Sequence, residues 1–187
     1  MTLNIHPFTP DQAEAFVRFF AKVDFSHAES WAGCYCQYYF TPVSPADWFK
    51  RPPAVNRAQA LELAAAGKLR GLLAWDGEQI AGWCNAADLA DAVLLADEAF
   101  FPTRRGEVGA VLCFVVDRPY RGQGLAARML AEAVEGFRAD GFTRVLGFPF
   151  ANPQNPLRQY HGSAHMFEAL GFRPASAAEP PFWELKL

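Results

Sequence analysis

One continuous stretch constrains the fold of this chain more than any other: an apolar run, a short loop with two glycines, and a helix that follows at once. Val108 to Val116 is almost wholly apolar and contains β-branched residues, which is typical of a central strand buried on both faces. Beyond Gly122, the segment from Gly124 to Arg138 has its apolar residues at helical spacing. A strand that leads through a tight loop into a helix predicts an α/β fold.

The remaining sequence adds further strands and helices to this unit. Asp76-Gly77 between two apolar runs indicates a hairpin. The predicted order is β–α–α–β–β–β–α–β–α–β, with strands near 2–6, 70–75, 79–86, 108–116, 143–148 and 182–187 and helices near 9–23, 54–66, 124–138 and 159–170. Segments 26–52 and 88–105 have no clear periodicity. We therefore expect one α/β domain over residues 1–187, with a mixed central sheet flanked by helices.

Composition narrows the classes of function. A formal charge of −3 gives little reason to expect a nucleic-acid partner. No apolar stretch reaches the roughly 18 residues of a membrane span, and the first residues do not resemble an export signal. Four cysteines without such a signal favour the reducing cytoplasm.

The glycine loop favours an anionic ligand. The first N–H groups of a helix have no intrahelical partner, and the helix dipole is positive at that end. Gly122 and Gly124 allow the backbone to turn sharply and to approach a bulky diphosphate closely. Arg121, with Arg128 one turn further, would add positive charge.

Two well-known phosphate loops do not fit this segment. A P-loop requires Lys and Ser or Thr after its second glycine, whereas Leu125 and Ala126 stand here. A dinucleotide fingerprint begins at the strand end, yet residues 117–121 intervene. That fingerprint also needs an acidic residue about 20 positions on, where this chain has 145–148 without one. A nicotinamide oxidoreductase is therefore the weakest of the classes considered.

A third pattern does fit. Arg121-x-x-Gly124-x-Ala126, preceded by 116–120, resembles the Arg/Gln-x-x-Gly-x-Gly/Ala signature of the GCN5-related N-acetyltransferases (GNAT), and 166–172 resembles the family's later helix with its Gly-Phe ending. The resemblance implies a single-domain GNAT-like fold whose central strands splay apart around acetyl-CoA. It also implies that the cofactor lies along the backbone of Phe114, Val115 and Val116, with its pyrophosphate on the amides of Arg121, Gly122, Gln123, Gly124, Leu125 and Ala126.

The residues that would move protons are less clear from the sequence. The family often places a carboxylate on the central strand, but 110–116 has none, and Asp117 is better explained as a loop cap. The usual Tyr on the later helix corresponds to Phe167, so Phe167→Tyr is expected to raise turnover if protonation of the leaving thiol limits the rate. Tyr160 as acid and His161 as base are the candidates, with a hydrogen-bonded structural histidine as the other interpretation of His161.

The aromatic segment from Trp31 to Tyr39 is the other unusual feature. On a strand, Cys34 and Cys36 would share a face, but a zinc site needs further ligands, so we expect no metal. Tyr35 and Tyr38 are candidates for the wall of a substrate pocket. An aromatic core beneath a long loop explains the segment equally well.

These observations predict a cytoplasmic acyltransferase that moves an acetyl group from acetyl-CoA to an amine of a small molecule or protein by direct attack on the thioester. A non-catalytic acyl-CoA-binding sensor or interaction domain is the alternative. We expect no nucleic-acid or membrane partner, and a homodimer is the one oligomer considered.

Overall fold

A seven-stranded sheet runs through the centre of the molecule in the order β1-β2-β3-β4-β5-β7-β6. The computed structural model describes residues 3–96, 104–149, 156–176 and 181–187. Within these, the pair β4–β5 is parallel and the other pairs are antiparallel. The strands are β1 (Asn4–Pro7), β2 (Gly71–Asp76), β3 (Gln79–Asp88), β4 (Val108–Val116), β5 (Arg144–Gly147), β6 (Arg173–Ser176) and β7 (Phe182–Lys186).

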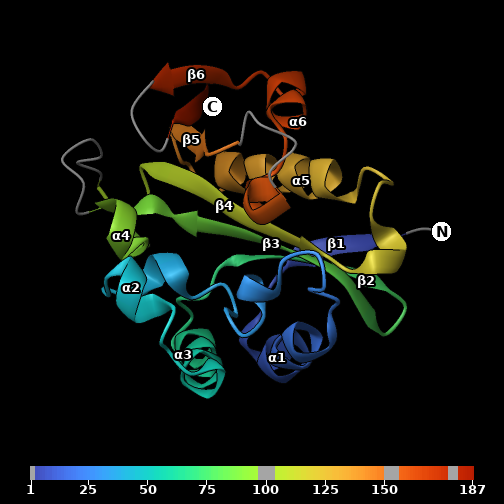
Figure 1. Cartoon of the computed structure of the whole chain (residues 1–187). Coiled ribbons are helices and arrows are strands. Elements are labelled where there is room, and N and C mark those ends of the chain that lie inside the picture. The colour runs from blue at the N-terminus through green and yellow to red at the C-terminus, as the bar shows by residue number, and fades with distance from the viewer. Residues whose placement is uncertain (1–2, 97–103, 150–155, 177–180) are drawn as a thin grey trace.

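Helices cover both faces of this sheet, as Figure 1 shows. The long helix α5 (Leu125–Ala139) lies on one face, and α1 (Ala13–Lys22) and α3 (Pro53–Ala65) lie on the other. The shorter helices are α2 (Pro45–Trp48), α4 (Val93–Ala96) and α6 (Ala164–Ala169), the last beside the C-terminal strands. No helix of the described residues is both long enough and apolar enough to cross a membrane.

The packing of β4 against α5 fixes the centre of the fold. Every residue of β4 except Val116 is buried, in agreement with its apolar sequence. At Gly109 a β-carbon would lie 2.7 Å from the ring of Phe137, so only glycine lets the helix approach the strand this closely. Met129 and Phe137 on the inner face of α5 are almost completely buried.

Two irregularities open the sheet beside β4. Its parallel pairing with β5 covers only Val108–Val111, whereas β4 continues five residues further to Val116. On the other side, Cys113 pairs with Asn85 but Val111 pairs with Ala86, so Leu112 is an extra residue in β4, a β-bulge. The predicted splaying of the central strands is therefore present, and a bulge lies at the point where it begins.

Most of the predicted elements are confirmed, including the hairpin at Asp76-Gly77 and the helix that follows Gly124. The predicted helix 159–170 is wrong in one respect: it is broken at Gly162, whose φ is +81°, into a 3-10 segment (Pro156–His161) and α6. The strand β6 was not predicted, because its Arg173-Pro174 start lacks the alternation of a strand. Of the predicted first strand, residue 2 lies outside the described residues.

Candidate functional site

The glycine loop forms an open main-chain surface at the start of α5. Gly122 and Gly124 have φ of +72° and +76°, and a β-carbon on either would meet nothing within 4 Å. The first intrahelical bond runs from the Arg128 N–H to the Gly124 carbonyl, so the N–H groups of the preceding turn are not used by the helix. Positive φ and free space together produce a concave row of N–H groups suited to an anion.

The side chain of Arg121 holds this loop in place rather than pointing to a ligand. Its Nε donates to the Val116 carbonyl at 2.8 Å, and one terminal nitrogen donates to the Asp24 carbonyl at 2.6 Å. The other terminal nitrogen lies 3.3 Å from Nδ1 of His27. Arg128, the second cation expected at the loop, donates to the Leu3 carbonyl at 3.1 Å. The loop therefore presents mainly backbone.

The edge of β4 that faces the splay also presents main-chain groups. The Asp117 N–H donates to the Ala81 carbonyl of β3, and residues of an antiparallel pair alternate between bonding the partner and pointing away. Phe114 and Val116 therefore direct their backbone groups away from β3, toward the side where β5 has ended. Of the three residues predicted to contact a cofactor by backbone, Val115 instead bonds toward β3 and presents its side chain to the cavities.

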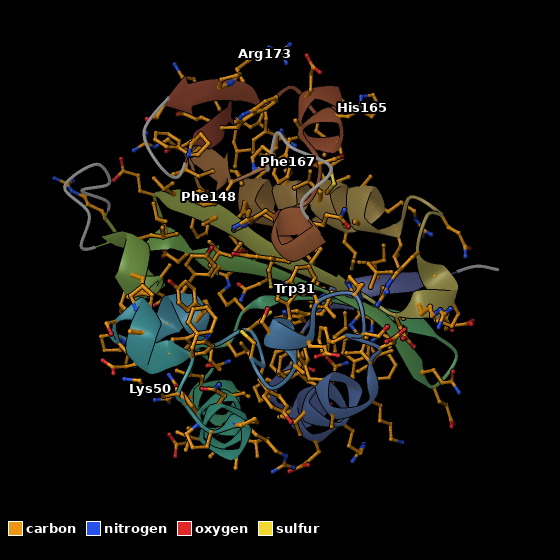
Figure 2. The ribbon with its side chains drawn as sticks, viewed as in Figure 1. Trp31, Lys50, Phe148, His165, Phe167 and Arg173 are labelled. Atoms are coloured by element: carbon orange, nitrogen blue, oxygen red, sulfur yellow. The ribbon has the colours of Figure 1, made fainter. Side chains whose placement is uncertain are left out.

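Two adjoining cavities meet at this edge. The smaller, about 140 Å³, includes Val116, Arg121 and Ala126 in its wall. The larger, about 600 Å³, lies between the sheet and the segments around α1 and α2. Both are bordered by the same four side chains: Phe25, Trp31, Val115 and Tyr160. Trp31, labelled in Figure 2, packs edge-on against Tyr160 with 5.2 Å between ring centroids. Because both residues border both cavities, this pair lies at the junction.

The larger cavity is mostly aromatic and carries no fixed charge. Aromatic side chains make up much of its wall, and no Asp, Glu, Lys or Arg of the described residues lines it. Besides the indole N–H groups, its polar groups are three cysteines, one serine, three tyrosines, Asn85 and His161. Tyr38 lies in the wall, whereas Tyr35 does not: it is buried and stacks on Phe20 at 5.7 Å.

The Cys34–Gln37 segment is a turn, not the strand considered from the sequence. The Gln37 N–H donates to the Cys34 carbonyl at 3.0 Å, and Tyr35 and Cys36 both have positive φ, as in a type I′ turn. Gln37, completely buried, supports the turn by donating to the Tyr35 carbonyl at 2.8 Å. Both cysteine side chains line the larger cavity.

The cysteines behave as buried neutral thiols. Burial raises the pKa of Cys34 to about 12, with Cys36 nearby as a further cause. Burial also raises the pKa of Cys36 well above its ordinary value, with the neighbouring Cys113 contributing. The described residues contain no cluster of three or more groups able to hold a metal ion.

His161 occupies the splay itself. It is buried, and its Nδ1 lies 2.9 Å from the Leu112 carbonyl in the bulge of β4. A carbonyl can only accept, so Nδ1 carries the hydrogen, and in the neutral ring Nε2 is left as the acceptor. The hydroxyl of Tyr39 lies 3.2 Å from Nε2 and donates to it. The geometry therefore fixes the tautomer that turns the basic nitrogen toward the cavity.

Tyr160 and Tyr39 form the polar surroundings of this histidine. The Tyr160 ring lies 4.0 Å from the His161 ring, centroid to centroid. Burial raises the pKa of Tyr39 well above its ordinary value, and the neighbouring Tyr160 adds to the shift, so Tyr39 stays protonated at neutral pH. Sequence reasoning misses Tyr39 because nothing distinguishes it from the other aromatic residues of 31–39.

Three residues weighed from the sequence lie elsewhere. Phe167 is completely buried against Phe114 and Phe172 and lines neither cavity. His165 is exposed on the outer side of α6 (Figure 2). Asp117 accepts from the Arg118 N–H at 2.8 Å, which confirms it as a loop cap.

Comparison with known proteins bears on both the loop and the fold. Residues 31–172, about three quarters of the chain, match the model of the acetyltransferase (GNAT) family. No curated protein matches the chain in sequence.

Several solved structures share the fold at low sequence identity. The N-acetyltransferase PaiA of Thermoplasma acidophilum, solved with coenzyme A, superposes with a TM-score of 0.58 at 13% identity over 100% of both chains. A ribosomal-protein-S5-alanine acetyltransferase of Vibrio fischeri gives 0.58 at 15% identity over 100% of this chain and 93% of its own. A GNAT-family N-acetyltransferase of Escherichia coli, solved with CoA, gives 0.56 at 16% identity over 98% and 81%.

Proposed function

The chain belongs to the acetyltransferase (GNAT) family, and we propose that it moves an acetyl group from acetyl-CoA to an amine of a small molecule or protein. One observation carries the proposal: the small cavity joins the glycine loop and the open edge of β4 to the larger cavity at a single junction. A donor in the first and an acceptor in the second would meet beside Val115 and Tyr160. Such placement supplies much of the rate in a direct transfer.

The donor fits the main-chain surfaces around α5. The N–H groups from Gly122 to Ala126 would hold the pyrophosphate, since Gly122 and Gly124 leave the approach open. The Arg121 N–H, also expected there, instead donates to the Arg118 carbonyl at 3.3 Å. The outward backbone groups of Phe114 and the N–H of Val116 would pair with the amide-containing arm as an added strand would, while the Val116 carbonyl is bonded to Arg121. Acetyl-CoA supplies the thioester, an acyl group already activated for attack by an amine. Two of the structural neighbours were solved with coenzyme A, which supports this choice of donor.

Proton transfer is assigned to the cluster at the splay. His161 Nε2 would accept the proton that the attacking nitrogen loses, with the Tyr39 hydroxyl between them as relay. We assign Tyr160 the role of giving a proton to the leaving thiolate, and its position at the border of both cavities supports this role. The described walls contain no carboxylate, which makes a histidine base the chemistry that this site offers.

The test has two measurements. Isothermal calorimetry should detect binding of acetyl-CoA, and a thiol reagent should detect free coenzyme A released in the presence of an amine. Binding without release on any acceptor would favour the non-catalytic alternative. Binding of NAD and no binding of acetyl-CoA would overturn the assignment of the donor site.

A cytoplasmic location is also proposed. The four cysteines are free thiols, which is usual for proteins of a reducing compartment.

A further inference from the structure

We propose that the acceptor is an uncharged aromatic amine whose far end carries a carboxamide-like group. This group would form hydrogen bonds with Asn85 in the wall of the larger cavity. This inference rests on the proposed function, because it names the substrate class of that site. Three features of the cavity carry it: a buried amide without a strong hydrogen-bond partner, the lack of charge among the described residues of the wall, and the length between the amide and the junction.

Asn85 is a buried polar side chain whose nearest polar neighbour among the described residues is the thiol of Cys36. It is 1% exposed, lies in the wall of the cavity, and neither its Oδ1 nor its Nδ2 has a hydrogen-bond partner among the described residues. The adjoining Cys36 thiol is a weak hydrogen-bonding group. An unsatisfied buried polar group costs about 1–3 kcal/mol, so an amide held this way calls for a partner from outside the chain.

The shape of the side chain specifies that partner. A carboxamide presents one acceptor and one donor side by side, and the group that satisfies both at once has a donor and an acceptor at the same spacing. A second carboxamide, or the edge of a lactam ring, has this arrangement. A carboxylate has no donor, and an ammonium group has no acceptor.

The described part of the cavity wall disfavours charged acceptors. A polyamine or a lysine side chain would place a cation where no described residue supplies a carboxylate, and a carboxylic acid would meet no Lys or Arg. Burying an unpaired charge is far more costly than burying a hydrogen-bonded neutral group. Phe20, Trp48 and Tyr38 instead offer apolar and aromatic contact, which suits a flat ring.

The position of Asn85 relative to the junction sets the length of the acceptor. Asn85 pairs with Cys113, and Val115 at the junction is two residues further along β4 on the same face. Two residues span about 7 Å, at roughly 3.4 Å each. A benzene ring with an amine at one end and a carboxamide at the opposite end bridges this length. The cavity volume of about 600 Å³ accommodates it with room for substituents.

The experiment compares four acceptors and two variants. Coenzyme A release is measured with 4-aminobenzamide, aniline, 4-aminobenzoate and spermidine, and binding of unreactive benzamide and benzoate is measured by calorimetry. We expect 4-aminobenzamide to have the highest kcat/KM, and benzamide but not benzoate to bind. Asn85→Leu keeps the size of the side chain and removes its hydrogen bonds, so KM for 4-aminobenzamide should rise about tenfold while that for aniline stays unchanged.

The controls separate this inference from a change in folding and from failure of the proposed function. Asn4→Leu makes the same substitution at an exposed position of the same sheet and should change neither acceptor. Asn85→Leu should also leave the melting temperature equal or higher, because it removes an unsatisfied group. Preference for spermidine, or equal effects of Asn85→Leu on both aromatic amines, would overturn the inference. Absence of acetyl-CoA binding would instead overturn the proposed function, and benzamide binding would still test Asn85.

Discussion

The two cavities that meet at Val115 are built from different material. On the donor side, the groups proposed to bind the cofactor are main-chain groups of one continuous segment, 114–126, which Arg121 holds in place, while Phe25, Trp31 and Tyr160 complete the cavity wall. The acceptor side is made of side chains from separate parts of the chain, including the 30–39 segment, α2, Asn85 on β3 and His161. Under the proposed function, donor recognition depends on backbone conformation, whereas acceptor recognition can change with single side chains and leave the donor site intact.

The largest expected effect comes from placing a charge on the main-chain side. Gly124→Glu should lower the affinity for acetyl-CoA by about 100-fold or more, because a carboxylate would project into the open space in front of the helix N-terminus. Calorimetry on the folded variant measures it. Gly124→Ala carries the same strain at φ +76° without the charge, and Gly136→Glu adds the charge at an exposed site far along α5. Equal affinity for Gly124→Glu and wild type would falsify the loop as the pyrophosphate site.

An effect of similar size is expected from the side-chain region, and it falls on turnover rather than on donor binding. In His161→Asn the amide can still donate to the Leu112 carbonyl, but the basic Nε2 is gone. Loss of a general base lowers kcat by about 100-fold or more, with acetyl-CoA affinity unchanged. The exposed His165→Asn is the matched control. If kcat survives in His161→Asn, the histidine is structural and the base lies elsewhere.

Phe167→Tyr tests whether the reacting groups in the two cavities extend as far as position 167. The ring is completely buried and lines neither cavity, so the new hydroxyl would be buried without a described partner. Stability should fall by about 1–3 kcal/mol in urea unfolding, and turnover should not increase. This differs from the expectation drawn from the sequence alone. A rise in kcat would show that the leaving thiol reaches Phe167, and Tyr160 would then lose its assigned role.

The smallest effect concerns His27, which lies in the wall of the small cavity and contacts the guanidinium of Arg121. Burial, and then the nearby Arg121, lower the pKa of His27, so the unfolded chain binds a proton more readily than the folded one. Stability should therefore decrease as pH falls below about 6.5, the ordinary histidine pKa. Urea unfolding of wild type and His27→Gln near pH 7.5 and 5.5 isolates this contribution as the difference between the two proteins. An identical pH dependence of stability in both proteins would contradict this role of His27 beside Arg121.

The backbone geometry of the proposed donor side could be predicted from the sequence because its signals are local. Gly122, Gly124 and the apolar strand before them are contiguous, and each residue type restricts the backbone in a known way. The role of Arg121 is only partly predictable: its charge is expected at the ligand, but its guanidinium bonds to Val116 and Asp24. Asp24 is far away in the sequence, so no local pattern could show this contact.

The acceptor side could not be predicted in the same way. Tyr39 meets His161 across 122 positions of sequence, and the turn at Cys34–Gln37 depends on a positive φ at two residues that rarely adopt it. Asn85 is the exception, because it is a polar residue near the end of a strand that is otherwise buried. Since buried polar side chains need hydrogen-bond partners, an asparagine in such a run is a local signal for a binding group.

The bulge at Leu112 also decides which side chains belong to which face. Before it, even-numbered residues of β4 (Val108, Ala110, Leu112) face the side of the larger cavity; after it, odd-numbered residues (Cys113, Val115) do. Val111 and Phe114 correspondingly face α5. The one inserted residue thus exchanges the faces of the sheet to which odd-numbered and even-numbered side chains of β4 point. Without it, the aromatic ring of Phe114 would project into the larger cavity and Val115 would be lost from the junction, so the inserted residue decides which side chains line the two cavities.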